Sequence, residues 1–217
     1  MSWRFEQKTD LELFDAWTRG DGRAASELFE RHFDAIDRFF RNKVMEGYED
    51  LVQATFEAAL KGRERFRAES SFRTYLFGIA NNLLLAHFRA RKRDRSRLEF
   101  TEVSACDLAP GPSTLFRAQR EQQLLLEALR RIPVEYQTVL ELYYWEELSG
   151  GAIADIVELP ENTVRSRIRK GKELLQRQMR ILARNPEELQ STLADLEAWV
   201  RSIHTRVKKD DESPATT

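Results

Sequence analysis

The chain has 217 residues, of which 35 are Lys or Arg and 36 are Asp or Glu, so its formal net charge is −1. This small net charge excludes a uniformly basic DNA-coating protein and a uniformly acidic tail protein, but it allows the two signs to be segregated along the chain. The single cysteine, Cys106, excludes a disulfide framework within the chain, and the three distant histidines lack the spacing of metal ligands. No apolar run approaches the ~20 residues of a membrane span, and the polar N-terminus does not resemble a signal peptide. These features predict a cytoplasmic protein without membrane insertion.

Apolar residues recur at helical spacing through most of the chain, and no strand-like alternation is convincing. The first block predicts helices over residues 10–19, 23–45, 49–60 and 71–97, with a polar connector at 62–71. Asp21 can cap the second of these helices, and Gly47 separates the second from the third. The fourth helix begins with an apolar half and ends with six bases between Arg89 and Arg97.

A change in composition follows at residues 98–115, where Pro110-Gly111-Pro112 and several acids without a base predict a flexible linker. The second block predicts helices over 122–131, 135–145, 148–157 and 161–183. Residues 185–217 then hold an amphipathic helix and a polar tail. The predicted fold is therefore all-α, with two small helical domains at 1–97 and 116–184, the linker between them, and a C-terminal extension.

Residues 148–168 predict a helix-turn-helix, in which a short helix and a turn at 158–160 precede a longer helix. Seven bases and two acids lie between Glu161 and Arg180. A DNA-binding helix-turn-helix needs a buried joint between the helices and a polar start of the second helix for base edges and phosphates. The alternative is an ordinary helical hairpin with a solvated face. Turn, core and charge agree in favouring the DNA-binding interpretation.

Aromatic and basic residues also gather around the start of the helix at 71–97. Aromatic rings beside Arg form platforms for unstacked single-stranded bases, and the six bases at the end of this helix would hold phosphates. Taken alone, an apolar core with a solvated basic face remains the stronger interpretation of this helix. The cluster comprises Phe66, Arg67, Phe72, Arg73, Tyr75, Phe77, Asn81 and Asn82.

The two blocks together resemble the extracytoplasmic-function (ECF, group 4) sigma factors of the bacterial sigma-70 family. Segments 49–56, 66–67 and 71–82 resemble that family's core-binding and promoter-melting domain. Ile132-Pro133, Leu148-Ser149, Ile153-Ala154 and 163–167 resemble its second domain. The resemblance spans roughly residues 9–180. It implies an alternative sigma factor for a stress or envelope-response regulon, which directs promoter recognition, DNA melting and transcription initiation. The sequence contains no nucleophile–base pair, metal-ligand set or phosphate loop with usable spacing, so we expect no enzyme activity, cofactor or metal.

The resemblance also assigns roles to residues. The residues that would dock on a coiled coil of the largest polymerase subunit are Glu49, Asp50, Leu51, Gln53 and Phe56. Capture of the −10 promoter element and its phosphates falls to Phe66, Arg67, Ser70, Ser71, Phe72, Tyr75, Asn82, Arg89, Arg91 and Lys92. Recognition of the −35 element falls to Thr163, Arg165, Ser166, Arg169 and Lys170. The second domain would also meet the polymerase flap, and an anti-sigma factor is a common partner in the family.

Two features depart from the family pattern. Gly47 and Ala54 stand where the family usually has acids, so either Glu49, Asp50 and apolar contacts suffice for docking, or phosphorylation of Thr55 restores the charge. The segment at 186–207 has apolar residues in alternating steps of four and three. This spacing favours a helix that packs on its own domain, and the alternative is a regulatory segment that contacts the first domain, the polymerase or a partner.

Two other functions explain parts of the sequence. A helix-turn-helix regulator that acts without polymerase would explain the second block but not residues 49–82. A helical polymerase-binding adaptor would explain the docking motif but not two DNA-binding faces.

Overall fold

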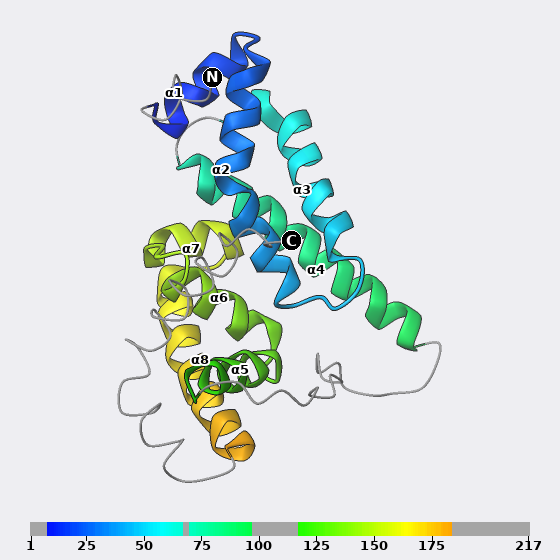
Figure 1. The fold of residues 1–217 in the computed structure, drawn as a ribbon, viewed down its shortest axis with the longest axis vertical. Coiled ribbons are helices and arrows are strands. Elements are labelled where there is room, and N and C mark those ends of the chain that lie inside the picture. The colour runs from blue at the N-terminus through cyan, green and yellow to red at the C-terminus, as the bar shows by residue number, and fades with distance from the viewer. Residues whose placement is uncertain (1–7, 67–69, 97–116, 184–217) are drawn as a thin grey trace, which may run out of the picture. The chain divides into compact units, whose positions relative to one another are not determined.

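The computed structural model describes residues 8–66, 70–96 and 117–183, and within these ranges it contains helices and turns but no strand (Figure 1). This confirms the all-α prediction. The chain forms two compact units. Unit 1 comprises residues 1–103 and 151–159, and unit 2 comprises residues 104–150 and 160–217. The predicted linker at 98–115 and the C-terminal segment at 185–217 lie outside the described residues.

The main helices of unit 1 are α1 (Asp10–Thr18), α2 (Gly22–Arg41), α3 (Tyr48–Gly62) and α4 (Phe72–Ser96), with a single 3₁₀ turn at Arg63–Arg65. Side chains fix where the first two begin. Thr9 forms a capping box with Glu12 at the start of α1. The Asp21 carboxylate accepts hydrogen bonds from the backbone N–H groups of Arg23 (3.0 Å) and Ala24 (3.3 Å), which confirms its predicted capping role at α2.

Helix α2 ends at Arg41, earlier than the predicted end near residue 45. The backbone N–H groups of Lys43 and Val44 both donate to the Phe40 carbonyl at 2.8 Å, so the chain leaves the helix in a tight turn. Lys43 is buried there, with its ammonium over the Phe39 ring. Gly47 then adopts a left-handed φ of 73°, which glycine reaches without a Cβ penalty, and α3 starts at the next residue.

Aromatic side chains form the centre of unit 1. Phe72, at the start of α4, is 3% exposed. Its ring centroid lies 5.8 Å from that of Phe14 and 6.5 Å from that of Trp17, both on α1. It lies 6.4 Å from that of Phe29 on α2. Full burial of one such ring stabilises the fold by about 1.5–3 kcal/mol. This cluster therefore joins α4 to α1 and α2.

Unit 2 contains α5 (Arg117–Arg130), α6 (Val134–Tyr144) and α8 (Glu161–Leu182), while α7 (Gly150–Val157) begins at the boundary between the units. Its core gathers apolar side chains from α5, α6 and α8, including Leu125, Leu129, Leu140, Leu175 and Met179. Helices α6 and α8 approach each other closely at Gly171. A Cβ at this position would lie 3.1 Å from two atoms of the buried Leu140 side chain.

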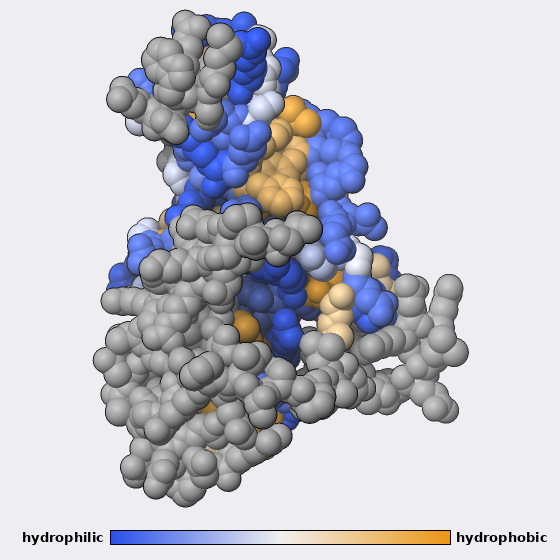
Figure 2. All heavy atoms as spheres, viewed as in Figure 1, coloured by the Kyte–Doolittle hydropathy of each residue, from blue (hydrophilic) through white to orange (hydrophobic). Residues whose placement is uncertain are grey.

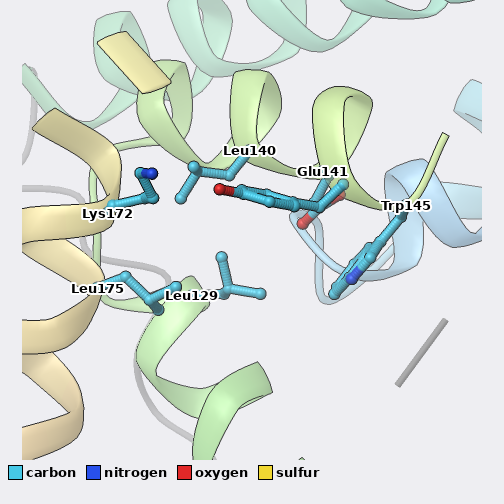
Figure 3. A pocket seen from close by; sticks show the side chains of 7 residues that line it. Leu129, Leu140, Glu141, Trp145, Lys172 and Leu175 are labelled. Atoms are coloured by element: carbon cyan, nitrogen blue, oxygen red, sulfur yellow. The ribbon is translucent and has the colours of Figure 1, made fainter. Parts of the chain in front are cut away.

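A cavity of about 10 Å³, roughly the space of one water molecule, lies within the core of unit 2. Figure 3 shows Leu140, Glu141 and Trp145 on one side of it and Leu129, Lys172 and Leu175 on the others. The Glu141 carboxylate is buried and accepts a 2.8 Å hydrogen bond from the Gln137 amide. This polar contact sits beside an otherwise apolar core.

Candidate functional site

The start of α3 carries exposed acidic side chains. Glu49 and Asp50 occupy its first turn, where the positive end of the helix dipole favours carboxylates. Gln53, one turn further on, is also exposed, and its amide donates to Glu57 at 2.9 Å. The spacing of three and four residues places Glu49, Asp50, Gln53 and Glu57 along one face of the helix. Leu51 is half-buried beside this acidic face.

An apolar face lies next to the acidic one, formed by aromatic residues of α2 and α3. Phe33 is 49% exposed and stacks on Phe56 with centroids 6.0 Å apart and planes 15° from parallel. Phe56 also contacts Phe29, and Leu60 is 45% exposed. Figure 2 shows hydrophobic residues at the surface over α2 and α3. An exposed aromatic face of this kind is typical of a protein-binding site.

Sequence reasoning counted Phe33 among the regularly spaced apolar residues of its helix and gave it no role. Helical spacing could not distinguish Phe33 from the core, because it precedes the buried Phe40 by seven residues and so shares its face of α2. Only the packing of the folded unit shows that Phe40 is covered and Phe33 is 49% exposed.

Thr55 lies on the interior side of α3. It is 0% exposed, and its hydroxyl donates a 2.8 Å hydrogen bond to the Leu51 carbonyl. A kinase could not reach this hydroxyl unless unit 1 opened, and a phosphate at this position would be a buried charge without solvation by water. The structure therefore argues against the hypothesis that phosphorylation of Thr55 restores the missing charge.

The residues predicted to capture the −10 element separate into a buried and an accessible group. Phe72 is part of the core described above, so it cannot offer a face to a base, and its predicted direct role is corrected to a structural one. Phe66 and Tyr75 are half-buried, with ring centroids 5.0 Å apart. These two rings remain candidates for stacking on an unpaired base.

Ser70 and Ser71 lie at the start of α4. The Ser71 hydroxyl accepts a 3.0 Å hydrogen bond from the backbone N–H of Thr74 and lies 2.9 Å from the Thr74 hydroxyl, so Ser71 caps the helix. Ser70 is half-buried, and Arg67 lies outside the described residues. The geometry thus gives Ser71 a definite local role, which fixes the start of the helix beside Phe66 and Tyr75.

Further along α4, Asn82, Arg89 and Arg91 are exposed, and Lys92 lies on the same helix. The Asn82 amide donates to Glu158 at 3.3 Å, a contact within unit 1. His87 lies among these residues, and burial, together with the nearby charge of Arg91, lowers its pKa. The exposed Arg side chains make this end of the helix a cationic surface suited to phosphates.

Helix α8 carries the second cationic surface. Thr163 is half-buried near its start, whereas Arg165, Ser166, Arg169 and Lys170 are exposed. Two of the bases pair with acids of the same helix: Arg165 with Glu161 at 2.6 Å and Lys170 with Glu173 at 3.0 Å. The Lys170 hydrogen bond and charge lower the pKa of the Glu173 carboxyl group.

Local contacts shape the turn that precedes α8. Leu159 donates its N–H to the Ala154 carbonyl at 3.1 Å, and Glu158 has a left-handed φ of 54°. A Cβ on Gly150 would lie 3.0 Å from the Glu161 carboxylate, so these two residues of unit 2 lie close together. The order of short helix, tight turn and long helix matches the predicted helix-turn-helix.

No helix in the described part of the chain is long and apolar enough to cross a membrane. Within the same residues, no group of three or more His, Cys, Asp or Glu side chains could hold a metal ion.

Comparisons with known proteins identify both blocks. Residues 28–94 match the family model "Sigma-70 region 2", and residues 122–175 match "Sigma-70, region 4". The ECF RNA polymerase sigma-E factor of Haemophilus influenzae is 27% identical over 186 residues, which cover 82% of this chain and 98% of that protein. The protein of the same name from Escherichia coli K12 is 27% identical over 188 residues, with the same coverage.

Two solved structures share the fold. One is the sigma factor RpoE in complex with the anti-sigma factor NepR from Bartonella quintana, with a TM-score of 0.58 and 22% identity over 72% of this chain and 96% of that one. The other is CnrH in complex with the cytosolic domain of CnrY, with a TM-score of 0.59 and 21% identity over 80% of this chain and 99% of that one. The two family models, the sequence relatives and the helical architecture agree: the chain belongs to the extracytoplasmic-function group of the sigma-70 family.

Proposed function

We propose that the chain acts in the cytoplasm as an alternative sigma factor, which binds core RNA polymerase and directs it to promoters. The observation that carries this proposal is the segregation of exposed charge onto separate helices. Acids lie on the first turns of α3, and bases lie on the second half of α4 and along α8. The action is one of binding, without covalent chemistry by the chain itself.

The polymerase-binding helix in this proposal is α3. Glu49, Asp50 and Gln53 face solvent and would meet a basic coiled coil of the largest polymerase subunit. The half-buried Leu51 and Phe56 would add apolar contact beside them. Charge complementarity of this kind speeds encounter and selects the partner, while apolar burial supplies most of the affinity.

Promoter opening would use the accessible rings near the start of α4. Phe66 and Tyr75 offer aromatic surface to a base of the −10 element once that base has left the stack. Arg89, Arg91 and Lys92 would hold phosphates of nearby duplex DNA. Stacking of one base contributes about 1–3 kcal/mol, which offsets part of the free energy of unpairing it.

Recognition of the −35 element would use α8 in a major groove. Arg165, Ser166, Arg169 and Lys170 are exposed on the first half of the helix, which is the half that a helix-turn-helix presents to base edges. Thr163 sits at its start, near the phosphates. Region 4 would also contact the polymerase flap, so that polymerase and DNA bind one unit together.

Regulation by an anti-sigma factor is part of this proposal. The structural relative from Bartonella quintana was solved with such a partner. In this chain, the exposed stack of Phe33 on Phe56 offers an apolar surface that a partner would cover. Stress or an envelope signal would then release the sigma factor for a dedicated regulon.

Run-off transcription tests the proposal: purified core polymerase and the full chain are supplied with a library of genomic fragments. We expect initiation at a small set of shared promoters. The paired variant Glu49→Gln/Asp50→Asn should lower polymerase affinity severalfold, whereas Glu30→Gln, a neutralisation of an exposed acid on α2, should not.

The same assay separates the rival functions. DNA binding by the chain alone, with no polymerase association and no initiation, would support a helix-turn-helix regulator. Polymerase binding without initiation at any promoter would support a polymerase-binding adaptor. Either outcome would overturn the proposal.

A further inference from the structure

A contact in unit 1 joins α1 to the rings assigned to the −10 element. The Phe14 ring on α1 meets the Phe66 ring edge to face, with centroids 4.6 Å apart and planes at 70°. Phe66 in turn lies 5.0 Å from Tyr75. Phe14 is 5% exposed, whereas Phe66 and Tyr75 are half-buried. Phe14 therefore supports Phe66 from the interior, and the accessible parts of Phe66 and Tyr75 face outward.

Tyr75 is constrained on a second side by Gly62, the last residue of α3. A Cβ added at Gly62 would lie 2.5 Å from the Tyr75 hydroxyl oxygen, so this oxygen rests directly against the backbone. Any larger residue at position 62 would push the ring away. The pair of rings is thus held by Phe14, by Gly62 and by the buried Phe72, whose ring centroid lies 6.0 Å from that of Phe66 and 6.1 Å from that of Tyr75.

Helix α1 is itself held firmly, so Phe14 is a fixed support. Asp10 lies 2.6 Å from the His32 ring nitrogen of α2. The Arg31 guanidinium donates to the Lys8 carbonyl at 2.6 Å and lies 3.6 Å from the Asp10 carboxylate. Helix α1 also lies outside residues 28–94, the part of the chain that matches the region 2 family model. The support comes from an element that the family match does not include.

We propose that Phe14 is a positioning residue for recognition of the −10 element: it holds Phe66, and through Phe66 the Tyr75 ring, in the orientation that receives an unpaired base. This inference rests on the proposed function. A captured base is selected when hydrogen bonds read its edge while its face stacks on a ring, so a ring that can tilt loses affinity for the correct base more than for the others. An edge-to-face pair is worth about a two- to tenfold change in an equilibrium constant.

The test uses holoenzyme assembled from core polymerase and the full-length chain carrying Phe14→Leu. Leu keeps an apolar side chain in the core but removes the ring edge that meets Phe66. The matched control is Phe40→Leu, because Phe40 is also buried (0% exposed) and its ring pairs with Phe39. Open-complex formation is measured on four promoters that differ only in the base proposed to be captured, and polymerase affinity is measured separately.

Phe14→Leu should lower open-complex formation on the preferred promoter two- to tenfold and reduce its preference over the other three, with polymerase affinity within twofold of wild type. Phe40→Leu should leave the base preference unchanged, even if stability falls. Equal losses on all four promoters, or the same behaviour in both variants, would overturn the inference. If Phe14→Leu does not fold, Phe14→Met replaces it in the test. If neither variant folds, Phe14 is required for folding and the inferred positioning role is overturned. A wild-type holoenzyme that initiates at no promoter would instead overturn the proposed function.

Discussion

Replacing Thr55 by Glu should unfold the region around α3 rather than strengthen polymerase binding. The side chain is 0% exposed, and its hydroxyl donates to the Leu51 carbonyl at 2.8 Å. Glu has two more side-chain heavy atoms than Thr and carries a charge, and Val52 and Ala59 on the same face of α3 are buried with Thr55. A mimic of phosphothreonine at this position must therefore expose itself by disrupting its own helix.

The expected loss of stability has three parts. Losing the hydroxyl hydrogen bond costs about 1 kcal/mol, and forcing a larger side chain into a close-packed interior costs about 1–3 kcal/mol. Burying an unpaired carboxylate adds several kcal/mol, unless it becomes protonated. The sum is at least ~3 kcal/mol. Thr55→Val has the same shape and no charge, so it should change the free energy of unfolding by only about 1 kcal/mol.

Hydrogen exchange of the α3 amides in the free protein measures this difference directly. A loss of ~3 kcal/mol corresponds to protection factors about 100-fold lower in Thr55→Glu, whereas Thr55→Val should stay within about tenfold of wild type. Polymerase titration on the same samples should show weaker binding for Thr55→Glu. Wild-type protection together with tighter polymerase binding would refute this reasoning and restore phosphorylation of Thr55 as a regulatory event.

Three further predictions follow from local contacts. In Gly78→Ala on α4, the added Cβ meets no atom within 4 Å, so the variant should stabilise unit 1 by about 0.5–1 kcal/mol. In Gly171→Ala, the Cβ must displace Leu140, so the variant should be neutral or destabilising by up to about 2 kcal/mol. Chemical denaturation compares the two variants, and an equal gain in the free energy of unfolding would contradict the close approach of α6 and α8. The His32 hydrogen bond and the charges of His32 and Arg31 lower the pKa of the Asp10 carboxyl group in the folded protein. The ionised Asp10 therefore stabilises the fold above pH ~4, and this stabilisation is lost as the pH falls through the lowered pKa. The stability difference between wild type and Asp10→Asn, followed by thermal unfolding, should therefore shrink below pH ~4, and a constant difference would count against this ion pair. Asp21→Ala removes the cap of α2 and should cost about 1 kcal/mol, measurable by the same unfolding experiment, with Asp21→Asn as a control that keeps the cap.

Local signals in the sequence were sufficient to predict most helix positions. The roles of Asp21 and Gly47 depend on residue type and not on tertiary contacts, because a short carboxylate can cap a helix and glycine can adopt a left-handed φ. The short helix, turn and long helix at 148–182 were predicted for the same reason. The end of α2 was placed too late because its final apolar residue, Val44, continues the helical spacing although the backbone has already turned.

Site residues that depend on contacts between helices were harder to predict. Helical spacing tells which residues share a face, but it does not tell which neighbour covers that face. Phe72 and Tyr75 are three residues apart on α4, yet α1 and α2 bury the first ring and leave the second half-exposed. Thr55 is buried by the same packing. The support of Phe66 by Phe14 joins residues more than fifty positions apart, and only the folded structure brings them together.

The ion pairs along α8 affect how DNA binding should respond to salt. A free cation that meets a phosphate displaces a counterion from DNA, and each such contact steepens the dependence of affinity on salt concentration. Arg165 and Lys170 are already paired with Glu161 and Glu173 of their own helix. When these cations reach phosphates, they exchange one anionic partner for another, and the released carboxylates gather cations from solution. The helix should therefore show a flatter salt dependence than its seven bases suggest, and more of its binding free energy should come from contacts that read sequence.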